Sequence, residues 1–189
     1  TSQFQISVEK EFSELVARAA RNTDAAAARD ALQRAIEASG LDFDREPDHG
    51  RAQLAAIYGL GLSGRLGFLT GAAGSGKTAL LSPLVTAWKE EGRQVIGTAM
   101  AWRQADALKD AGVDRTVALS PLLREIEAGR LAIAPNSVLI IDEGSQIAPN
   151  QMLKLLRLQK EVGFSMRIIA DREQAQAIEA GDSVELMMR

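Results

Sequence analysis

The sequence predicts an α/β domain in which helices cover both faces of a parallel sheet. Short apolar runs alternate with helix-like segments, one of these runs (Val138 to Ile141) has no polar residue, and a glycine-rich turn separates the first run from the next helix. Strands that are apolar throughout are typical of parallel sheets buried on both faces. Ligands of such sheets bind at the carboxyl ends of the strands.

The elements of this domain are predicted from the period of their apolar residues. Leu80, Leu84 and Trp88 recur at helical spacing and are expected to face the sheet. Lys154, Arg157 and Lys160 line one helical face, which indicates a solvated surface or a contact with a nucleic-acid backbone or partner. Strands are expected at residues 66–70, 94–98, 138–141 and 166–170, and helices at residues 51–62, 77–91, 103–111, 119–128 and 150–161.

The N-terminal part of the chain is predicted to be helical and separate from this domain. Residues 7–39 show helical periodicity over two segments, and Thr23 is expected to cap the second helix. Residues 41–50 are acidic and are predicted to be a linker. The chain therefore divides into a helical segment with its linker at residues 1–45 and an α/β domain at residues 46–189.

The composition is that of an ordinary globular protein of 189 residues, with 46% apolar and 25% charged residues. No apolar run approaches the roughly 18 residues of a membrane span, and no signal peptide opens the chain, so no membrane partner is expected. The absence of cysteine excludes disulfides and fits a cytoplasmic protein. A net charge of −3 does not indicate a basic surface for binding nucleic acid. The chain starts at Thr1 without Met, which indicates a fragment of a larger protein.

The glycine-rich turn fits the phosphate-binding loop pattern G-x-x-x-x-G-K-[ST]. Its glycines let successive backbone N–H groups face one phosphate, and the helix that follows adds its positive N-terminal end. The lysine would reach the β- and γ-phosphates, and the threonine hydroxyl would bind Mg²⁺. The sequence therefore predicts a nucleoside-triphosphate site of the P-loop NTPase kind. Its residues are Gly71, Ala72, Ala73, Gly74, Ser75, Gly76, Lys77 and Thr78.

Two further polar segments follow predicted strands. Asp142 can hold Mg²⁺ at the end of the most apolar strand, and Glu143 can orient and deprotonate the attacking water. Gln174, beyond the last strand, can touch the γ-phosphate, although Asp171 could instead be an ordinary helix cap. Glu143 favours hydrolysis over transfer to a small acceptor.

The order of these motifs resembles that of superfamily-1 DNA helicases of the RecD-like branch, and within it the helicase half of conjugative-transfer relaxases (the MobF group). The likeness spans roughly residues 48–183, and it rests on the phosphate loop, on Asp142-Glu143-Gly144-Ser145, and on Asp171-Arg172-Glu173-Gln174. It implies a RecA-like fold (helicase domain 1A), ATP with Mg²⁺ as ligands, and single-stranded DNA as a partner of the full-length protein.

The resemblance also implies roles for single residues. Gln53 would read the adenine edge, and Gln174 would couple the γ-phosphate to the DNA-binding elements. Trp102, Arg103 and Thr116 fall in the family's DNA-contacting segments. The usual hydroxyl is missing around Trp102, which could stack on a base or pack into the core.

The resemblance places an essential arginine in a second motor domain of the same parent chain. Because such an arginine contributes about 10³–10⁵ in rate, this chain alone is expected to bind ATP–Mg²⁺ but to hydrolyse it very slowly. His49 and Tyr58 do not make a DNA-nicking site.

Two other functions remain open at this point: a P-loop kinase or nucleotide-gated switch that does not act on DNA, and a partner-binding domain with an idle nucleotide site. The first leaves the segment of Gln174 unexplained, and the second leaves Lys77, Thr78, Asp142 and Glu143 unexplained. No guanine-reading segment of GTPases and no signature of transporter ATPases is present.

Overall fold

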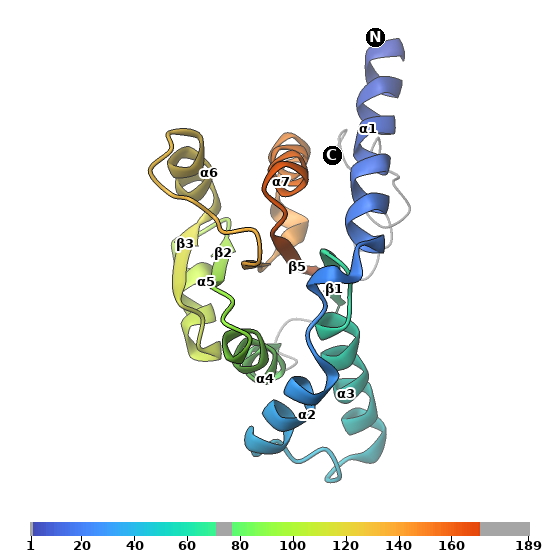
Figure 1. Cartoon of the computed structure of the whole chain (residues 1–189), viewed down its shortest axis with the longest axis vertical. Coiled ribbons are helices and arrows are strands. Elements are labelled where there is room, and N and C mark those ends of the chain that lie inside the picture. Colours follow the sequence, from blue (N-terminus) through green and yellow to red (C-terminus); the bar gives the residue numbers. More distant parts are fainter. Residues whose placement is uncertain (1, 71–76, 171–189) are drawn as a thin grey trace.

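Five parallel strands form one sheet in the computed structural model, which describes residues 2–70 and 77–170 (Figure 1). The strands lie in the order β1-β5-β4-β2-β3. Their bounds are β1 (Leu66–Thr70), β2 (Val95–Ala99), β3 (Arg115–Ala118), β4 (Val138–Ile141) and β5 (Ser165–Ala170). The helices are α1 (Ser2–Arg21), α2 (Arg29–Ala38), α3 (Pro47–Gly61), α4 (Lys77–Glu90), α5 (Trp102–Ala107), α6 (Leu119–Glu127) and α7 (Pro149–Val162). Three short 3-10 helices are η1 (Thr23–Ala25), η2 (Leu108–Ala111) and η3 (Gly144–Gln146).

Helices cover both faces of the sheet, as the sequence predicted. Figure 1 shows α1, α6 and α7 above the sheet and α2, α3 and α4 below it. Side chains of each strand alternate between the two hydrophobic cores. On β4, Leu139 and Ile141 belong to the core under α6 and α7, whereas Val138 and Ile140 belong to the core under α4. The α/β fold with a covered parallel sheet is confirmed.

The N-terminal helices pack against the sheet domain on opposite faces. The second half of α1 lies against α7, with Phe12 and Val16 in one core, while α2 packs on α4 with Leu32 in the other. The Arg157 guanidinium donates to both carboxylate oxygens of Glu11, at 2.7 and 2.8 Å, and so connects α7 to α1. The expected linker at residues 41–50 is shorter than predicted, because α3 already begins at Pro47.

The predicted cap at Thr23 is wrong. Asn22 accepts the N–H of Asp24 at 3.1 Å and starts η1, so Thr23 lies inside this 3-10 turn. The next residues are extended because Ala27 N donates to the Gly61 carbonyl at 2.7 Å and Ala28 N to a Glu91 carboxylate oxygen at 2.9 Å. The helix α2 therefore starts only at Arg29, without a side-chain cap.

Strand β3 was not predicted. Residues 115–118 are exposed at their start and apolar only at Val117 and Ala118, so no strand pattern is visible in the sequence. The strand forms because it pairs with β2 at the sheet edge, where Gly97 is opposite Thr116. Tertiary pairing thus overrides a weak local signal.

A fully buried arginine, Arg167, lies in the middle of β5, and its hydrogen-bond acceptors are all backbone carbonyls. Its Nε donates to Leu60 O at 2.8 Å and its Nη2 to Ser63 O at 3.2 Å, at the C-terminal end of α3. The guanidinium also lies 5.8 Å from the centre of the Trp88 ring. Burial, and secondly the charge of Arg93, lowers the pKa of Arg167 to about 9, so the group stays charged at neutral pH. Arg167 therefore fixes the end of α3 to the sheet.

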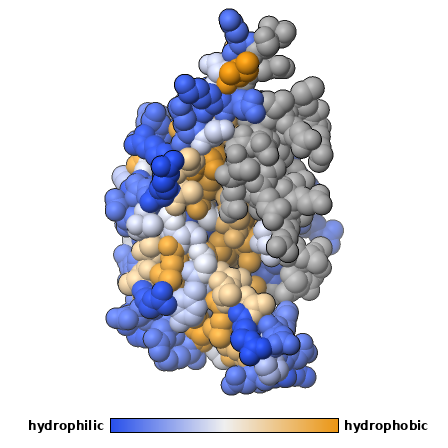
Figure 2. Space-filling view, turned by 90° about the vertical axis from the view of Figure 1, so that its right-hand side faces the viewer, coloured by the Kyte–Doolittle hydropathy of each residue, from blue (hydrophilic) through white to orange (hydrophobic). Residues whose placement is uncertain are grey.

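Strand β1 forms an edge of the sheet among the residues that the structure describes. Figure 2 views the molecule from the side on which α1, β1 and α3 lie, and apolar surface runs there in a broken band between hydrophilic ends. Across residues 2–70 and 77–170, no helix is both long and apolar enough to span a bilayer.

We expect Arg167→Met to lower the free energy of unfolding by about 2–4 kcal/mol, because it leaves the buried carbonyls of Leu60 and Ser63 without donors. Denaturant unfolding monitored by tryptophan fluorescence would measure the loss. The matched control is Arg130→Met, which removes an exposed arginine and should change stability by less than about 0.5 kcal/mol. Equal effects of both substitutions would show that Arg167 does not hold α3.

Candidate nucleotide-binding site

The carboxyl ends of β1, β5 and β4 lie side by side. Thr70 is opposite Ala170, and Ile141 is opposite Ile168, so both outer strands end within two residues of each other along β5. Asp142 N donates to Thr98 O at 2.9 Å, which continues the ladder beyond β4. Because only β5 separates β1 from β4, these two strands lie about 10 Å apart.

Helix α4, which begins at Lys77, and Asp142 lie on the same face of the sheet. Val138 and Ile140 point toward α4, and the alternation along the strand puts Asp142 on the same side. The helix α4 begins at the half-buried Lys77, soon after β1 ends at Thr70. The positive N-terminal end of α4 therefore lies at the edge where the Asp142 carboxylate stands, as a phosphate site requires.

The segment Asp142-Glu143-Gly144 is backbone-strained and tightly packed. Glu143 has φ 52° and ψ 45°, and it is the only non-glycine residue with positive φ among the residues that the structure describes. This left-handed conformation costs about 1–2 kcal/mol in an L-residue. Asp142 Oδ1 accepts the Glu143 N–H at 2.8 Å, which fixes the carboxylate against its own turn. Such strain is typical of functional sites.

Gly144 is a site residue whose role the sequence did not predict. A Cβ at this position would lie 2.4 Å from Ile168 Cγ2 and 3.3 Å from the Ile169 carbonyl. Only glycine therefore lets the chain turn against β5 directly after Glu143. The signal in the sequence was a glycine just after two carboxylates at a strand end.

Some predicted site residues lie outside the part of the chain that the structure describes. These are the loop from Gly71 to Gly76 and Gln174. Thr78 is the second residue of α4.

Gln53 is half-buried in α3, beside α4. Figure 1 shows the start of α3 at the bottom of the molecule, away from the sheet, and its end beside β1. The adenine contact of Gln53 stays a prediction.

Trp102 lies near the same edge of the sheet. It opens α5, shortly after the end of β2, the strand next to β4. Its side chain is 55% exposed, so it is not part of the core, and Arg103 beside it is exposed too. This exposure leaves the Trp102 ring accessible to a ligand.

The hydroxyl of Thr116 is engaged within the protein. It donates to Asp106 Oδ1 at 3.1 Å and so joins β3 to α5. Hydrogen bonds from Lys109 and then from Thr116 lower the pKa of Asp106. Arg115, next to it, pairs with Glu125 at 2.8 Å. A DNA contact through Thr116 would compete with this existing hydrogen bond.

The donor chemistry at this edge fits a magnesium nucleotide. A carboxylate oxygen such as that of Asp142 is a ligand that Mg²⁺ prefers, and so is the hydroxyl oxygen that the sequence predicts from Thr78. Phosphate oxygens of a nucleotide would complete the shell. No cluster of three or more His, Asp or Glu side chains that could hold a metal by itself occurs among the described residues.

Comparison with known proteins places most of the chain in one family. The family model of the AAA domain matches residues 49–189. The conjugal transfer protein TraA of Rhizobium radiobacter is 32% identical over 151 residues, which cover 78% of this chain and 14% of that protein. The protein of the same name from Agrobacterium fabrum is 33% identical over 137 residues, which cover 70% of this chain and 12% of that protein.

These matches confirm the resemblance to conjugative-transfer proteins that the motifs indicated. A probable conjugal transfer protein TraA of Sinorhizobium fredii is 31% identical over 140 residues, which cover 74% of this chain and 13% of that protein. The chain thus spans between 12 and 14% of the length of these curated relatives.

We expect Gly144→Ala to destabilise the protein by about 1–3 kcal/mol, because its methyl group would overlap Ile168. Gly59→Ala in α3 is the control, since no atom lies within 4 Å of its added Cβ. The control should be neutral or stabilising by up to about 1 kcal/mol. Thermal unfolding of both variants measures the difference, and a neutral Gly144→Ala would contradict the tight turn.

Proposed function

Since this chain belongs to the AAA domain family, we propose that it is the ATP-binding motor domain of a superfamily-1 DNA helicase within a conjugative-transfer relaxase. Similarity to conjugal transfer proteins and the order of the motifs support this proposal. Residues 46–189 form the motor domain, and residues 1–45 form a helical segment that packs on it. The parent protein supplies a second motor domain and acts on single-stranded DNA in the cytoplasm.

The observation that best supports the proposal is that α4, which begins at Lys77, packs on the face of the sheet on which Asp142 follows β4. Only β5 separates β1 from β4, so we expect one triphosphate to reach from the residues after β1 to those after β4. The positive helix end and the Lys77 ammonium group suit the phosphates, and the Asp142 carboxylate suits the cation that accompanies them.

Hydrolysis is assigned to the residues that follow β4 and β5. The Glu143 carboxylate accepts a proton from the water that attacks the γ-phosphorus, while the bond from the γ-phosphorus to the bridging oxygen of ADP breaks. Thr78 and Asp142 would hold Mg²⁺, which would neutralise charge on the phosphates. Gln174 senses the γ-phosphate, Gln53 reads adenine, and the backbone of residues 71–76 cradles the phosphates.

The DNA strand is expected to pass near α5, where Trp102 is exposed close to the nucleotide edge. A base stacked on this ring would contribute about 1–3 kcal/mol to binding. Arg103 supplies positive charge for the backbone. Movement of this region with the nucleotide state would couple hydrolysis to translocation.

The direct test of the function is the ATPase rate of the full-length parent protein with and without single-stranded DNA. We expect strong stimulation by DNA. The rate should fall at least about 100-fold in Glu143→Gln, with ATP binding retained, because only the proton acceptor is lost. Lys77→Ala should abolish activity by weakening nucleotide binding.

Glu161→Gln, an exposed carboxylate on α7, is the matched control and should keep the full rate. A rate that does not respond to DNA would favour a kinase or nucleotide-gated switch. Absence of turnover in the unchanged protein would favour an idle site. Turnover of several molecules per second by residues 1–189 alone would contradict the need for a second motor domain.

We expect Trp102→Ala to weaken binding of a fluorescent oligothymidylate to the full-length protein by roughly 5- to 150-fold, which corresponds to the loss of one stacked base. Trp102→Phe keeps an aromatic ring and should lose much less. Because the side chain is 55% exposed, neither variant should alter the unfolding temperature. Unchanged DNA affinity in Trp102→Ala would exclude stacking at this position.

A further inference from the structure

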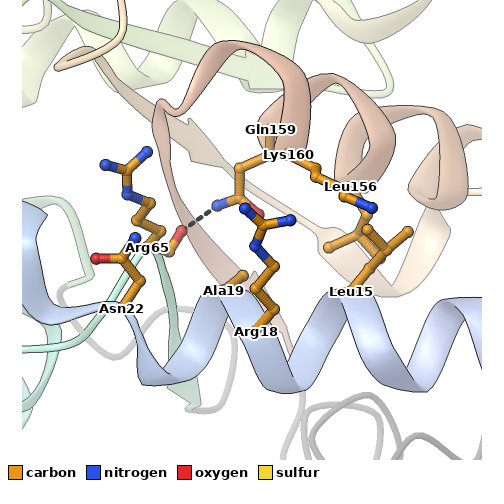
Figure 3. Close-up of a pocket in the computed structure, with 8 residues that line it drawn as sticks. All are labelled: Leu15, Arg18, Ala19, Asn22, Arg65, Leu156, Gln159 and Lys160. Carbon is orange, nitrogen blue, oxygen red and sulfur yellow. Dashed lines mark hydrogen bonds between the residues drawn. The ribbon is translucent and has the colours of Figure 1, made fainter.

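A hollow lies at the opposite edge of the sheet from the nucleotide site. It is formed by the C-terminal parts of α1 and α7 and by Arg65, which directly precedes β1, and its cavity volume is about 40 Å³ (Figure 3). Strand β1 is five residues long, so its two ends lie about 16 Å apart. The hollow is therefore separate from the carboxyl edge. Its lining residues are Leu15, Arg18, Ala19, Asn22, Arg65, Leu156, Gln159 and Lys160.

The charged side chains that line this hollow are all cationic. Arg18, Arg65 and Lys160 contribute three positive charges, and the other polar lining residues are the neutral amides Asn22 and Gln159. Figure 3 shows the Arg18 side chain rising from α1 toward Gln159. Gln159 itself donates to the backbone carbonyl of Arg65. This local charge contrasts with the net charge of −3 for the whole chain.

Nearby carboxylates leave most of this charge unbalanced. Glu11 is bound by Arg157 through two hydrogen bonds, and Lys160 acts on it only as a weaker, more distant charge. Glu14 lines an adjoining hollow together with Arg18 and Arg21, so Arg21 adds a further positive charge there. Four cations thus face one unpaired carboxylate around the two hollows.

Two helix ends account for only part of the remaining charge. The C-terminal ends of α1 and α7 each carry about half a negative charge. Arg21 Nε donates to Ala17 O at 3.2 Å in the last turn of α1, and Arg65 Nη1 donates to Gly163 O just after α7. Subtracting both ends leaves an excess of about two positive charges. Interaction with the negative helix ends therefore does not account for the positive charges of Arg18 and Lys160.

The hollow offers hydrogen-bond donors that have no acceptors. The Arg18 guanidinium makes no hydrogen bond or ion pair within the described part of the chain. Arg65 Nε is buried and has no acceptor among the same residues. A ligand oxygen in the hollow would give the Arg18 guanidinium the acceptor that the protein does not supply.

We propose that this hollow binds a phosphate group. An excess of about two positive charges matches the charge of a phosphate better than that of a single carboxylate, and guanidinium groups bind phosphate oxygens through paired N–H donors. The phosphate comes either from a nucleic-acid strand or from a free small anion, and the site does not depend on the proposed motor function.

The test uses NMR of the 189-residue chain carrying Lys77→Ala, so that the predicted phosphate loop does not compete. Inorganic phosphate, an oligothymidylate and an oligoglutamate are each titrated at constant ionic strength, and the side-chain amide signals of Asn22 and Gln159 are followed. We expect saturable shifts of both signals with phosphate or oligothymidylate. The double variant Arg18→Gln, Lys160→Gln should weaken this binding at least tenfold.

A matched double variant, Lys10→Gln with Arg130→Gln, removes the same charge from exposed positions elsewhere and should keep the affinity within about twofold. Saturation by inorganic phosphate identifies a free-anion site, and saturation by oligothymidylate alone identifies a strand contact. Shifts with oligoglutamate only would overturn the proposal in favour of an acidic protein partner. No saturable shift, or shifts that persist in Arg18→Gln, Lys160→Gln, would overturn it as well.

Discussion

The register of β1 and β4 on either side of β5 is the constraint on which the rest of this structure depends. Thr70 and Ile141 meet β5 two residues apart, so the segments that follow both strands emerge at one edge. A slip of one residue would turn Asp142 to the face away from α4. The register is fixed because Val138, Ile140 and Ile169 must face the core under α4. Core burial thus determines where the carboxylate stands.

The two edges of the sheet differ in how their polar groups are satisfied. At the amino edge, buried arginines are held by carbonyls and hydroxyls: Arg93 donates to Asn136 O at 2.7 Å and to Ser165 Oγ at 3.1 Å, and Arg167 holds the end of α3. At the carboxyl edge, Glu143 is in a strained conformation against Gly144. Buried arginines therefore connect elements toward the edge away from the candidate nucleotide site, whereas the strained backbone lies at the edge near it.

Much of the fold could be predicted from the sequence because its strands are apolar throughout and its helices have clear periodicity. The segments at residues 66–70 and 138–141 matched β1 and β4 to the residue. Strand β3 was missed because only its pairing with β2 makes it a strand. Thr23 was wrongly assigned as the cap of the second helix because the hydrogen bonds that keep residues 27 and 28 extended come from distant residues, which local sequence does not reveal.

The sequence predicted only those functional residues that belong to a recognisable motif. Lys77, Asp142 and Glu143 were predicted from their motifs, and their roles stay predictions. The structure shows that α4, which begins at Lys77, packs on the face of the sheet toward which Val138 and Ile140 of β4 point. Nothing in the sequence indicated that Arg167 is buried, since a charged residue in an apolar segment usually indicates a strand end or an exposed position. Its partners, Leu60 and Ser63, lie more than 100 positions away.

The most direct test of the account is a double-mutant cycle on the binding of a fluorescent ATP analogue with Mg²⁺. Affinities are measured for the unchanged chain, Lys77→Ala, Asp142→Ala and the double variant. If both side chains hold one magnesium nucleotide, the two losses should be non-additive, with a coupling energy above about 1 kcal/mol. Losses that add within about 0.3–0.5 kcal/mol, or no binding by the unchanged chain, would contradict a shared ligand.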